Sequence, residues 1–266
     1  MTIFQSIVLG IVEGLTEFLP ISSTAHMKFV NPLLGVEATD PFNEMFEVVI
    51  QLAAILAVVL LYHKKFFDFK RIIFYWKLII GIIPALVVGY FGKKYIDQAL
   101  GNLTFIACVM IGGGVLLLFI EKLFKNPVIR KEEQISTKNA FVVGCFQVLS
   151  IIFPGLSRSA ATIIGGLQQR FTRSVAAEFS FFLAVPTMLA ASVKTLWDTY
   201  QDHPDVFNTG NLSVLATGSV VSFIVALIAI KVFIGFVKKY GFPVWGVYRI
   251  IVGTVMLVLL LSGKIH

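Results

Sequence analysis

The chain has 266 residues, of which 57% are apolar and only 14% are charged, and its mean hydropathy is +0.87. Soluble domains average roughly 45–50% apolar and 25% charged residues, so this composition excludes an ordinary water-soluble fold. The net charge of +7 does not indicate a nucleic-acid-binding protein, because the basic residues lie in short segments between apolar blocks rather than in one patch.

The first apolar block, residues 2–34, is interrupted near its middle by Pro20 and the polar run Ser22-Ser23-Thr24. Each half is too short to cross a hydrocarbon core of roughly 30 Å comfortably. Irregular backbone is tolerated at that depth only where protein or a wet cavity surrounds it. The block therefore predicts a re-entrant hairpin, in which two short helices enter the membrane and turn back.

Three uninterrupted apolar blocks follow, each long enough for one membrane-spanning helix; they cover residues 45–62, 72–92 and 103–121. A basic linker then leads to a second interrupted block, residues 139–169, which predicts another re-entrant hairpin. Three further spans complete the chain, at residues 174–197, 212–237 and 245–262. The expected fold is an all-α polytopic membrane protein with six full spans and two re-entrant helical hairpins.

The order of one hairpin and three spans occurs twice, which predicts a single membrane domain, 1–266, built from an internal duplication. Its parts are a first repeat, a basic cytoplasmic linker and a second repeat, at residues 1–121, 122–138 and 139–262. Three crossings per repeat are an odd number, so the second repeat is inverted relative to the first. In such folds discontinuous helices meet near the membrane midplane, so the two hairpins are expected to enter from opposite faces.

The polar residues of the two hairpins match when Pro20 is laid on Pro154. This superposition pairs Glu13 with Gln147. It also pairs a serine of the first interruption with one of the second, Ser23 with Ser157. We therefore expect the two interruptions to occupy equivalent places in the two repeats.

The loop charges predict the orientation of the chain. One face carries 13 of the 22 basic residues, namely Lys64, Lys65, Lys70, Arg71, Lys122, Lys125, Arg130, Lys131, Lys138, Arg170, Arg173, Lys238 and Lys239. The loops of the other face are mainly acidic, with Glu37, Asp40, Glu44, Asp97, Asp198, Asp202 and Asp205. Cytoplasmic loops are enriched in Lys and Arg, so we expect the basic face in the cytoplasm and the first hairpin open to the outside.

Two carboxylates, Glu13 and Glu17, lie four residues apart and so project from one face of the first half-helix. Insertion scales give a penalty of roughly 2.5–3.5 kcal/mol for an acidic residue at the centre of a membrane helix. One interpretation is a solvated or salt-bridged pair near the interface. The other, which we favour, is a ligand pair for a divalent cation such as Mg²⁺, which prefers oxygen ligands.

Hydroxyl groups open the second half-helix of the first hairpin, and His26 follows one turn later. Any one of the hydroxyls is explained as an N-cap, but a cap needs only one of them and does not need His26. A helix N-terminus also offers free amides and a positive dipole to an anion. We therefore expect a phosphate to bind beside the hydroxyls of Ser22, Ser23 and Thr24.

Arg158 is the only ionised residue between Lys138 and Arg170, and it lies on the first turn of a half-helix in the second hairpin. Snorkelling to the interface would explain an arginine near a membrane surface, but a midplane position leaves the interface out of reach. A guanidinium binds two phosphate oxygens at once. We expect Arg158 to bind phosphate together with the hydroxyls of Ser157, Ser159 and Thr162.

Two motifs give the chain a resemblance to a known family. Residues 13–26, EGLTEFLPISSTAH, and residues 154–162, PGLSRSAAT, look like the two signatures of the bacterial undecaprenyl-diphosphate phosphatases of the bacitracin-resistance type. Residues 46–52, FEVVIQL, and the hydropathy pattern of the whole chain also agree with this family. The family often has Gly where this chain has Ala25 and Ala160, and we expect no loss of function because alanine is a good helix former.

The resemblance implies an integral membrane hydrolase that removes the terminal phosphate of undecaprenyl diphosphate. The product, undecaprenyl phosphate, is the lipid carrier reused in peptidoglycan synthesis. The resemblance also implies a divalent cation, Mg²⁺ or Ca²⁺, and a place in the bacterial cytoplasmic membrane with the site open to the outer, periplasmic side. Beyond the lipid substrate and membrane lipid, we allow for a homodimer as a partner assembly.

By position, the family's functional set falls on Glu13, Glu17, Ser23, His26 and Arg158. We assign Glu13 and Glu17 to the cation and Arg158 to the diphosphate. Ser23 is the expected nucleophile, with Glu17 or His26 taking its proton. An attacking water in place of Ser23 is the open alternative for this step.

Two rival functions belong to different classes. Inverted repeats with discontinuous helices are also a transporter architecture, so a transporter or flippase of a lipid phosphate is the leading alternative. Transport does not require a serine, an imidazole and carboxylates beside a cation site, and this feature favours hydrolysis. A non-catalytic membrane scaffold predicts that Arg158 and the two glutamates are replaceable without loss.

Overall fold

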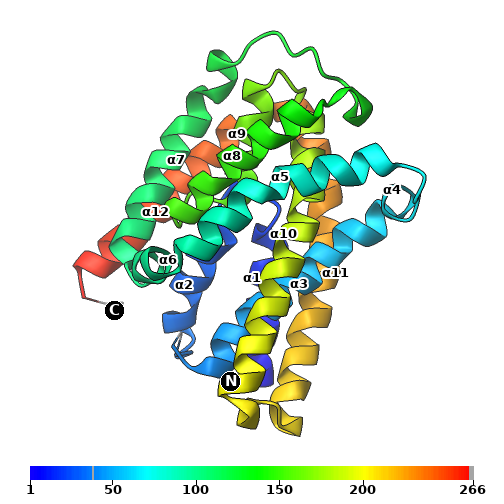
Figure 1. The fold of residues 1–266 in the computed structure, drawn as a ribbon. Helices are drawn as coiled ribbons and strands as arrows, with labels where there is room; N and C mark the ends of the chain where they lie inside the picture. The colour runs from blue at the N-terminus through cyan, green and yellow to red at the C-terminus, as the bar shows by residue number, and fades with distance from the viewer. Residues whose placement is uncertain (38, 264–266) are drawn as a thin grey trace.

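The computed structural model describes residues 1–37 and 39–263, which form helices joined by mostly short loops (Figure 1). In this part of the chain the only β-structure is an isolated bridge between Ile129 and Phe171. Six helices are long and apolar enough to cross a membrane: α3 (Pro41–Leu61), α5 (Ile72–Phe91), α7 (Leu103–Leu123), α10 (Arg173–Asp202), α11 (Thr209–Tyr240) and α12 (Pro243–Leu261). The predicted all-α polytopic membrane fold is confirmed.

Both interrupted blocks form pairs of shorter helices. The first pair is α1 (Ile3–Thr16) and α2 (Ser23–Leu33), and the second is α8 (Thr137–Ile152) and α9 (Arg158–Gln168). Capping boxes start both pairs, because Thr2 and Ser136 exchange hydrogen bonds with the residue three positions further on. The chain therefore breaks at the two polar interruptions, as the sequence predicts.

Several boundaries differ from the predicted ones. The predicted span 174–197 is part of the longer helix α10, because a helix continues into polar sequence beyond the hydrocarbon core. Since α7 ends at Leu123 and α8 begins at Thr137, the linker is shorter than residues 122–138. The remaining elements are too short for a periodic pattern to predict them: α4 (His63–Phe66), α6 (Lys93–Leu100) and the 3₁₀ turns Glu132–Gln134 and Pro204–Val206.

The helices of the two halves pack against each other in matching pairs. Helix α1 packs along α11, its counterpart α8 packs along α5, and α7 packs along α12. Glycines allow two of these close approaches: a Cβ on Gly10 would lie 2.7 Å from the carbonyl oxygen of Gly218, and Gly144 faces the backbone of Gly81. Small residues are the usual means by which membrane helices come close. The first helix of each hairpin is thus held by a span from the other half.

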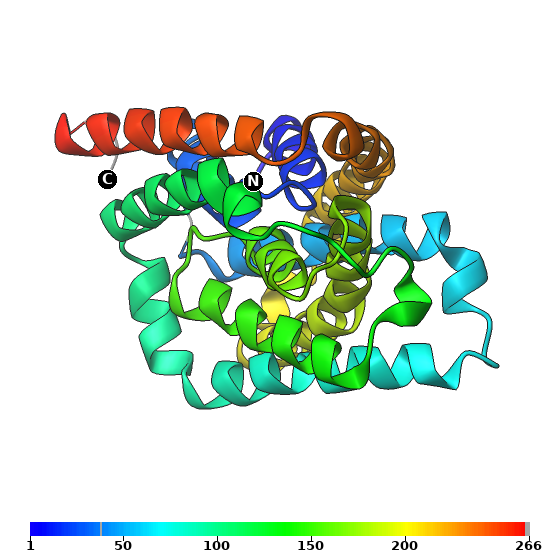
Figure 2. The same cartoon turned by 90° about the horizontal axis from the view of Figure 1, so that it is seen from above.

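The tips of the two hairpins, residues 16–27 and 154–167, are largely buried in the interior of this bundle. Seen from above, α5 and α12 run along opposite sides of the molecule with the second hairpin between them (Figure 2). The linker 124–136 lies at one end of the molecule and the turn around residues 203–208 at the other (Figure 1). The first of these segments carries three basic and two acidic residues, and the second carries one aspartate and no Lys or Arg, so the two ends differ in charge.

Candidate functional site

The second helix of each hairpin begins at a serine with unusual backbone geometry. The φ angle is +71° at Ser22 and +76° at Ser157, a region that residues with a side chain seldom adopt. Each serine hydroxyl accepts a hydrogen bond from the amide three residues on, Ala25 at 3.3 Å and Ala160 at 3.2 Å. Outliers of this kind concentrate at functional sites, and here the same one occurs twice.

These caps correct the superposition derived from the sequence. Ser157 corresponds to Ser22, not to Ser23, so Ser23 and Arg158 occupy equivalent positions as the first residues of α2 and α9. The reason is that Pro20 lies three residues before the first residue of α2, whereas Pro154 lies four residues before the first residue of α9.

Glu17 is the centre of a hydrogen-bond network between the two hairpins. Its Oε2 accepts hydrogen bonds from the Ser23 hydroxyl at 2.7 Å and from the Gln51 amide at 3.0 Å. Its Oε1 accepts one from Nη2 of Arg158 at 2.9 Å. Arg158 also donates to the carbonyl oxygen of Ser180 at 3.1 Å. The structure thus brings together Glu17, Ser23 and Arg158, three of the four residues predicted to be catalytic.

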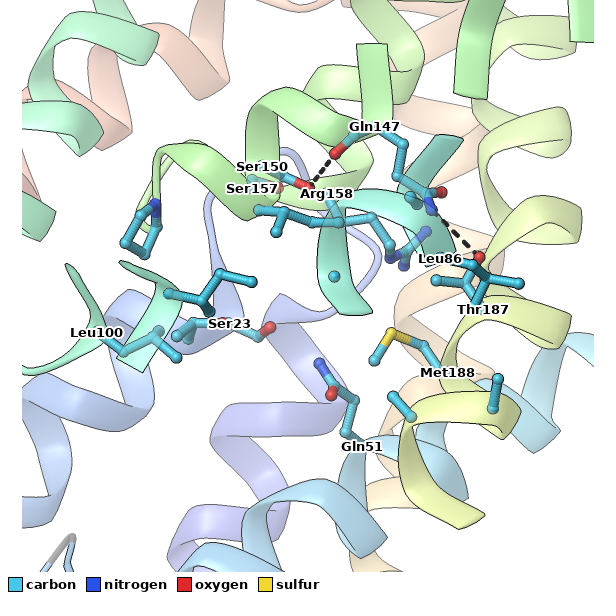
Figure 3. Close-up of a pocket in the computed structure, with 18 of the residues that line it drawn as sticks. Ser23, Gln51, Leu86, Leu100, Gln147, Ser150, Ser157, Arg158, Thr187 and Met188 are labelled. Carbon is cyan, nitrogen blue, oxygen red and sulfur yellow. Dashed lines mark hydrogen bonds between the residues drawn. The ribbon is translucent and has the colours of Figure 1, made fainter. Parts of the chain in front are cut away.

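A cavity of about 960 Å³ lies beside this network. Ser157 and Arg158 reach it from one wall, and Ser23 and Gln51 from the opposite wall (Figure 3). The rest of its lining is largely apolar and comes from α5, α6, α8 and α10, including Leu86, Phe91, Ile96, Leu100 and Met188. One polar end and a long apolar part suit an anionic headgroup that carries an apolar tail.

His26 lies away from this cavity. Its Nδ1 is 2.7 Å from the carbonyl oxygen of Ser22, and its Nε2 is 2.9 Å from the hydroxyl of Tyr248. A carbonyl only accepts, so Nδ1 carries the proton and Nε2 accepts from Tyr248. The ring also stacks on Tyr248, with centroids 5.7 Å apart. This position does not support the predicted role of His26 in proton transfer at Ser23, because His26 faces α12.

Two of the predicted phosphate-binding hydroxyls are used inside the protein. Ser159 donates to the carbonyl oxygen of Leu19 at 2.8 Å. Thr162 donates to the carbonyl oxygen of Arg158 at 2.9 Å and lies 2.6 Å from the hydroxyl of Ser180. Neither residue lines the cavity, so both hold the second hairpin in place. The hydroxyl-bearing residues that do line the cavity are Ser22, Ser23, Thr24, Tyr90, Ser150, Ser157 and Thr187.

Of the carboxylates predicted to bind a cation, Glu13 lies on the last turn of α1 and Glu17 is the C-cap residue directly after this helix. Glu13 is only 3% exposed, and no described residue donates a hydrogen bond to its Oε1. Within residues 1–37 and 39–263 there is no group of three or more His, Cys, Asp or Glu placed to hold a metal. Two carboxylates nevertheless fit Mg²⁺, which is usually bound through one or two carboxylates plus waters and substrate phosphates.

The sequence interpretation missed two residues of α12, Tyr248 and Arg249. Arg249 is completely buried, and its guanidinium donates hydrogen bonds to carbonyl oxygens of both hairpin turns. The sequence did contain a signal for Arg249, which is an ionised residue inside the apolar block 245–262. Placing an ionised residue in a membrane costs free energy, so such a residue is by default expected to have a function.

Fold and site together define a multi-pass membrane protein with a buried polar site for an anionic lipid headgroup. The family model described as "Bacitracin resistance protein BacA" matches residues 6–255, and the chain belongs to this family. Three relatives, each named undecaprenyl-diphosphatase, are similar over nearly their whole length. The protein of Porphyromonas gingivalis is 47% identical (99% of this chain, 98% of the relative), that of Flavobacterium psychrophilum 46% (97% and 96%) and that of Bdellovibrio bacteriovorus 42% (99% and 98%).

Proposed function

We propose that this chain is an undecaprenyl-diphosphate phosphatase, which removes the terminal phosphate of undecaprenyl diphosphate and leaves undecaprenyl phosphate. One observation carries the proposal. Ser23 and Arg158, which come from different hairpins, both donate hydrogen bonds to the carboxylate of Glu17 at the polar end of the cavity. The names of the relatives support the same activity. The alternative of a lipid-phosphate transporter or flippase receives no support from them.

Arg158 binds the diphosphate in this mechanism. Its Nη2 contacts Glu17, and no described residue accepts a hydrogen bond from its buried Nε, so the guanidinium keeps donor capacity for phosphate oxygens. The hydroxyls of Ser22, Thr24 and Ser157 line the same end of the cavity. Fixed donors around a phosphate oxygen stabilise the charge that develops in the transition state.

Ser23 is the proposed nucleophile. Its hydroxyl already donates to Oε2 of Glu17, so the proton passes to this carboxylate as Oγ bonds to the terminal phosphorus. The bond between that phosphorus and the bridging oxygen breaks, and undecaprenyl phosphate leaves. Water then cleaves the phosphoserine, which releases inorganic phosphate and restores Ser23.

Glu13 and Glu17 are the residues that would hold a divalent cation, Mg²⁺ or Ca²⁺. The buried, unpartnered Oε1 of Glu13 supports this assignment. When bound, the cation supplies positive charge to the oxygens of the transferred phosphate. Excess chelator should therefore abolish turnover, with recovery when Mg²⁺ or Ca²⁺ is added back. Full turnover in chelator would contradict the assignment.

The proposal includes a location in the bacterial cytoplasmic membrane, with the basic loops in the cytoplasm and the site open to the periplasmic side. The apolar part of the cavity, between α5 and α10, gives the isoprenyl tail a path to the surrounding lipid. The proposal also allows for a homodimer, and the molar mass of the detergent-solubilised protein measured by light scattering tests this assembly.

The deciding experiment measures phosphate release from isoprenyl diphosphates of defined chain length by purified protein in detergent. We expect release of one inorganic phosphate per diphosphate, with no membrane compartment present. Transport of the lipid in sealed vesicles without any phosphate release in detergent would replace the phosphatase with a carrier.

A further inference from the structure

Arg249, on α12, is the largest completely buried side chain of the described residues. Its Nη1 donates to the carbonyl oxygens of Pro20 at 3.0 Å and Leu156 at 2.7 Å, and its Nη2 donates to that of Gly155 at 2.9 Å. Its Nε donates to the carbonyl oxygen of Met110 on α7 at 3.1 Å. One guanidinium therefore joins the turn of the first hairpin to the turn of the second.

Three of these carbonyl groups, those of Pro20, Gly155 and Leu156, lie where the helices are interrupted. Pro20 precedes α2, and Gly155 and Leu156 precede α9, so their oxygens lack the helical partners that satisfy a membrane-spanning backbone. A guanidinium offers five N–H donors in a rigid fork. Within residues 1–37 and 39–263 Arg249 forms no ion pair, and the carbonyl dipoles are the groups that balance its charge.

We infer that Arg249 is a positioning residue for the proposed reaction: it fixes the turn before Ser23 relative to the turn before Arg158. Arg249 does not line the cavity, so it acts on the substrate only through the backbone of the two turns. The turns also carry the Ser22 and Ser157 caps with positive φ, a conformation that persists only where surrounding structure enforces it.

Gly113 on α7 gives the guanidinium its space. A Cβ on Gly113 would lie 3.0 Å from Cζ of Arg249 and closer still to Nη2, and 3.1 Å from Cδ1 of Leu156. A Cβ on the neighbouring Gly112 would meet nothing within 4 Å. Both glycines lie on α7, and each variant adds the same methyl group. Gly113→Ala and Gly112→Ala therefore form a matched pair in which only the first displaces Arg249.

The inference rests on the proposed function where it is tested by turnover, whereas its second test, by hydrogen exchange, does not depend on that function. We expect Gly113→Ala and Arg249→Lys to lower kcat by about 10²-fold, the loss typical of a misplacement of about 1 Å, with KM changed far less. Hydrogen exchange measured by mass spectrometry should be faster in both turns, 18–23 and 153–158, in these variants. Gly112→Ala should behave like the parent in both measurements.

Equal turnover and equal exchange in Gly113→Ala and Gly112→Ala would overturn the inference. Faster exchange in only one turn would also overturn it, because a residue that holds a single turn does not set the distance between them. Should the parent itself release no phosphate, the proposed function fails, and the exchange rates of the paired glycine variants still test the link between the turns.

Discussion

At the scale of single residues, Glu17 is the side chain on which the site depends. It is 5% exposed and accepts hydrogen bonds from α2, α3 and α9 through Ser23, Gln51 and Arg158. A buried carboxylate without partners would be strongly destabilising. The contacts that make Glu17 tolerable in the membrane are also those that place a hydroxyl and a guanidinium beside each other.

The two serines at the hairpin tips should differ in their kinetic effects. Ser23→Ala removes the proposed nucleophile and should lower turnover by several orders of magnitude with substrate binding largely kept. Ser157→Ala removes a cavity-lining hydroxyl, which lies 2.9 Å from that of Ser159 in the structure, and should lower kcat by roughly 10²–10³-fold, the loss typical of one oxyanion donor. Turnover of both variants is measured under saturating lipid. Ser6→Ala is the control, because it removes a buried hydroxyl that is bonded only to the carbonyl oxygen of Val214. Parent-like turnover in Ser23→Ala would assign the attack to a water.

Arg158→Lys should remove most of the activity although the positive charge is kept. An ammonium cannot reproduce the planar fork that reaches Glu17 and the carbonyl oxygen of Ser180 together. Phosphate release and thermal unfolding of the purified variant are the measurements. Arg173→Lys is the matched control, since Arg173 forms a two-point ion pair with Glu121 outside the cavity. Similar activities in the two variants would show that Arg158 acts only as bulk charge.

At the scale of the helices, the hairpins depend on close packing against spans of the other half. Gly144 of α8 has no space for a side chain because the backbone of Gly81 faces it. Overpacking of this kind typically costs about 1–3 kcal/mol, and here it would push the second hairpin away from α5.

Gly144→Ala should therefore lower the midpoint of thermal unfolding in detergent. Gly235→Ala on α11 is the control, since a Cβ there would meet nothing within 4 Å, and alanine favours a helix over glycine. The control should be as stable as the parent or slightly more stable. A Gly144→Ala protein as stable as the Gly235→Ala protein would show that α8 and α5 can separate without loss.

At the scale of the whole molecule, the bundle has a basic end and an acidic end, and orientation follows from the charge of short loops. The linker 124–136 lies at one end and the turn around residues 203–208 at the other (Figure 1). The basic loop before α5 is expected on the same side as the linker.

Single cysteines test this orientation in a background that lacks the exposed Cys108 and Cys145. Lys70→Cys and Asp205→Cys replace exposed residues of loops, so neither should disturb the fold. An impermeant thiol reagent applied to sealed cells should label position 205 and not position 70. The reverse pattern would place the opening of the first hairpin in the cytoplasm.

Much of this architecture is specified by short stretches of sequence. Apolar blocks of sufficient length specify the spans, and a proline beside a polar run specifies each interruption, because lipid offers the backbone no alternative partners. The cost of ionised groups in an apolar body also singled out Glu17 and Arg158. The sequence by itself determined these features, because each depends on a few neighbouring residues and on the membrane.

Only the tertiary structure decided which of these polar groups meet. Glu17 and Arg158 are 141 positions apart, and His26, in the same motif as Ser23, faces Tyr248 on α12 instead of the cavity. The one-residue shift that pairs Ser23 with Arg158 and the link that Arg249 makes between the turns are likewise absent from any local pattern. Which face of a helix meets which neighbour is set by packing between segments distant in sequence, and hydropathy carries no record of it.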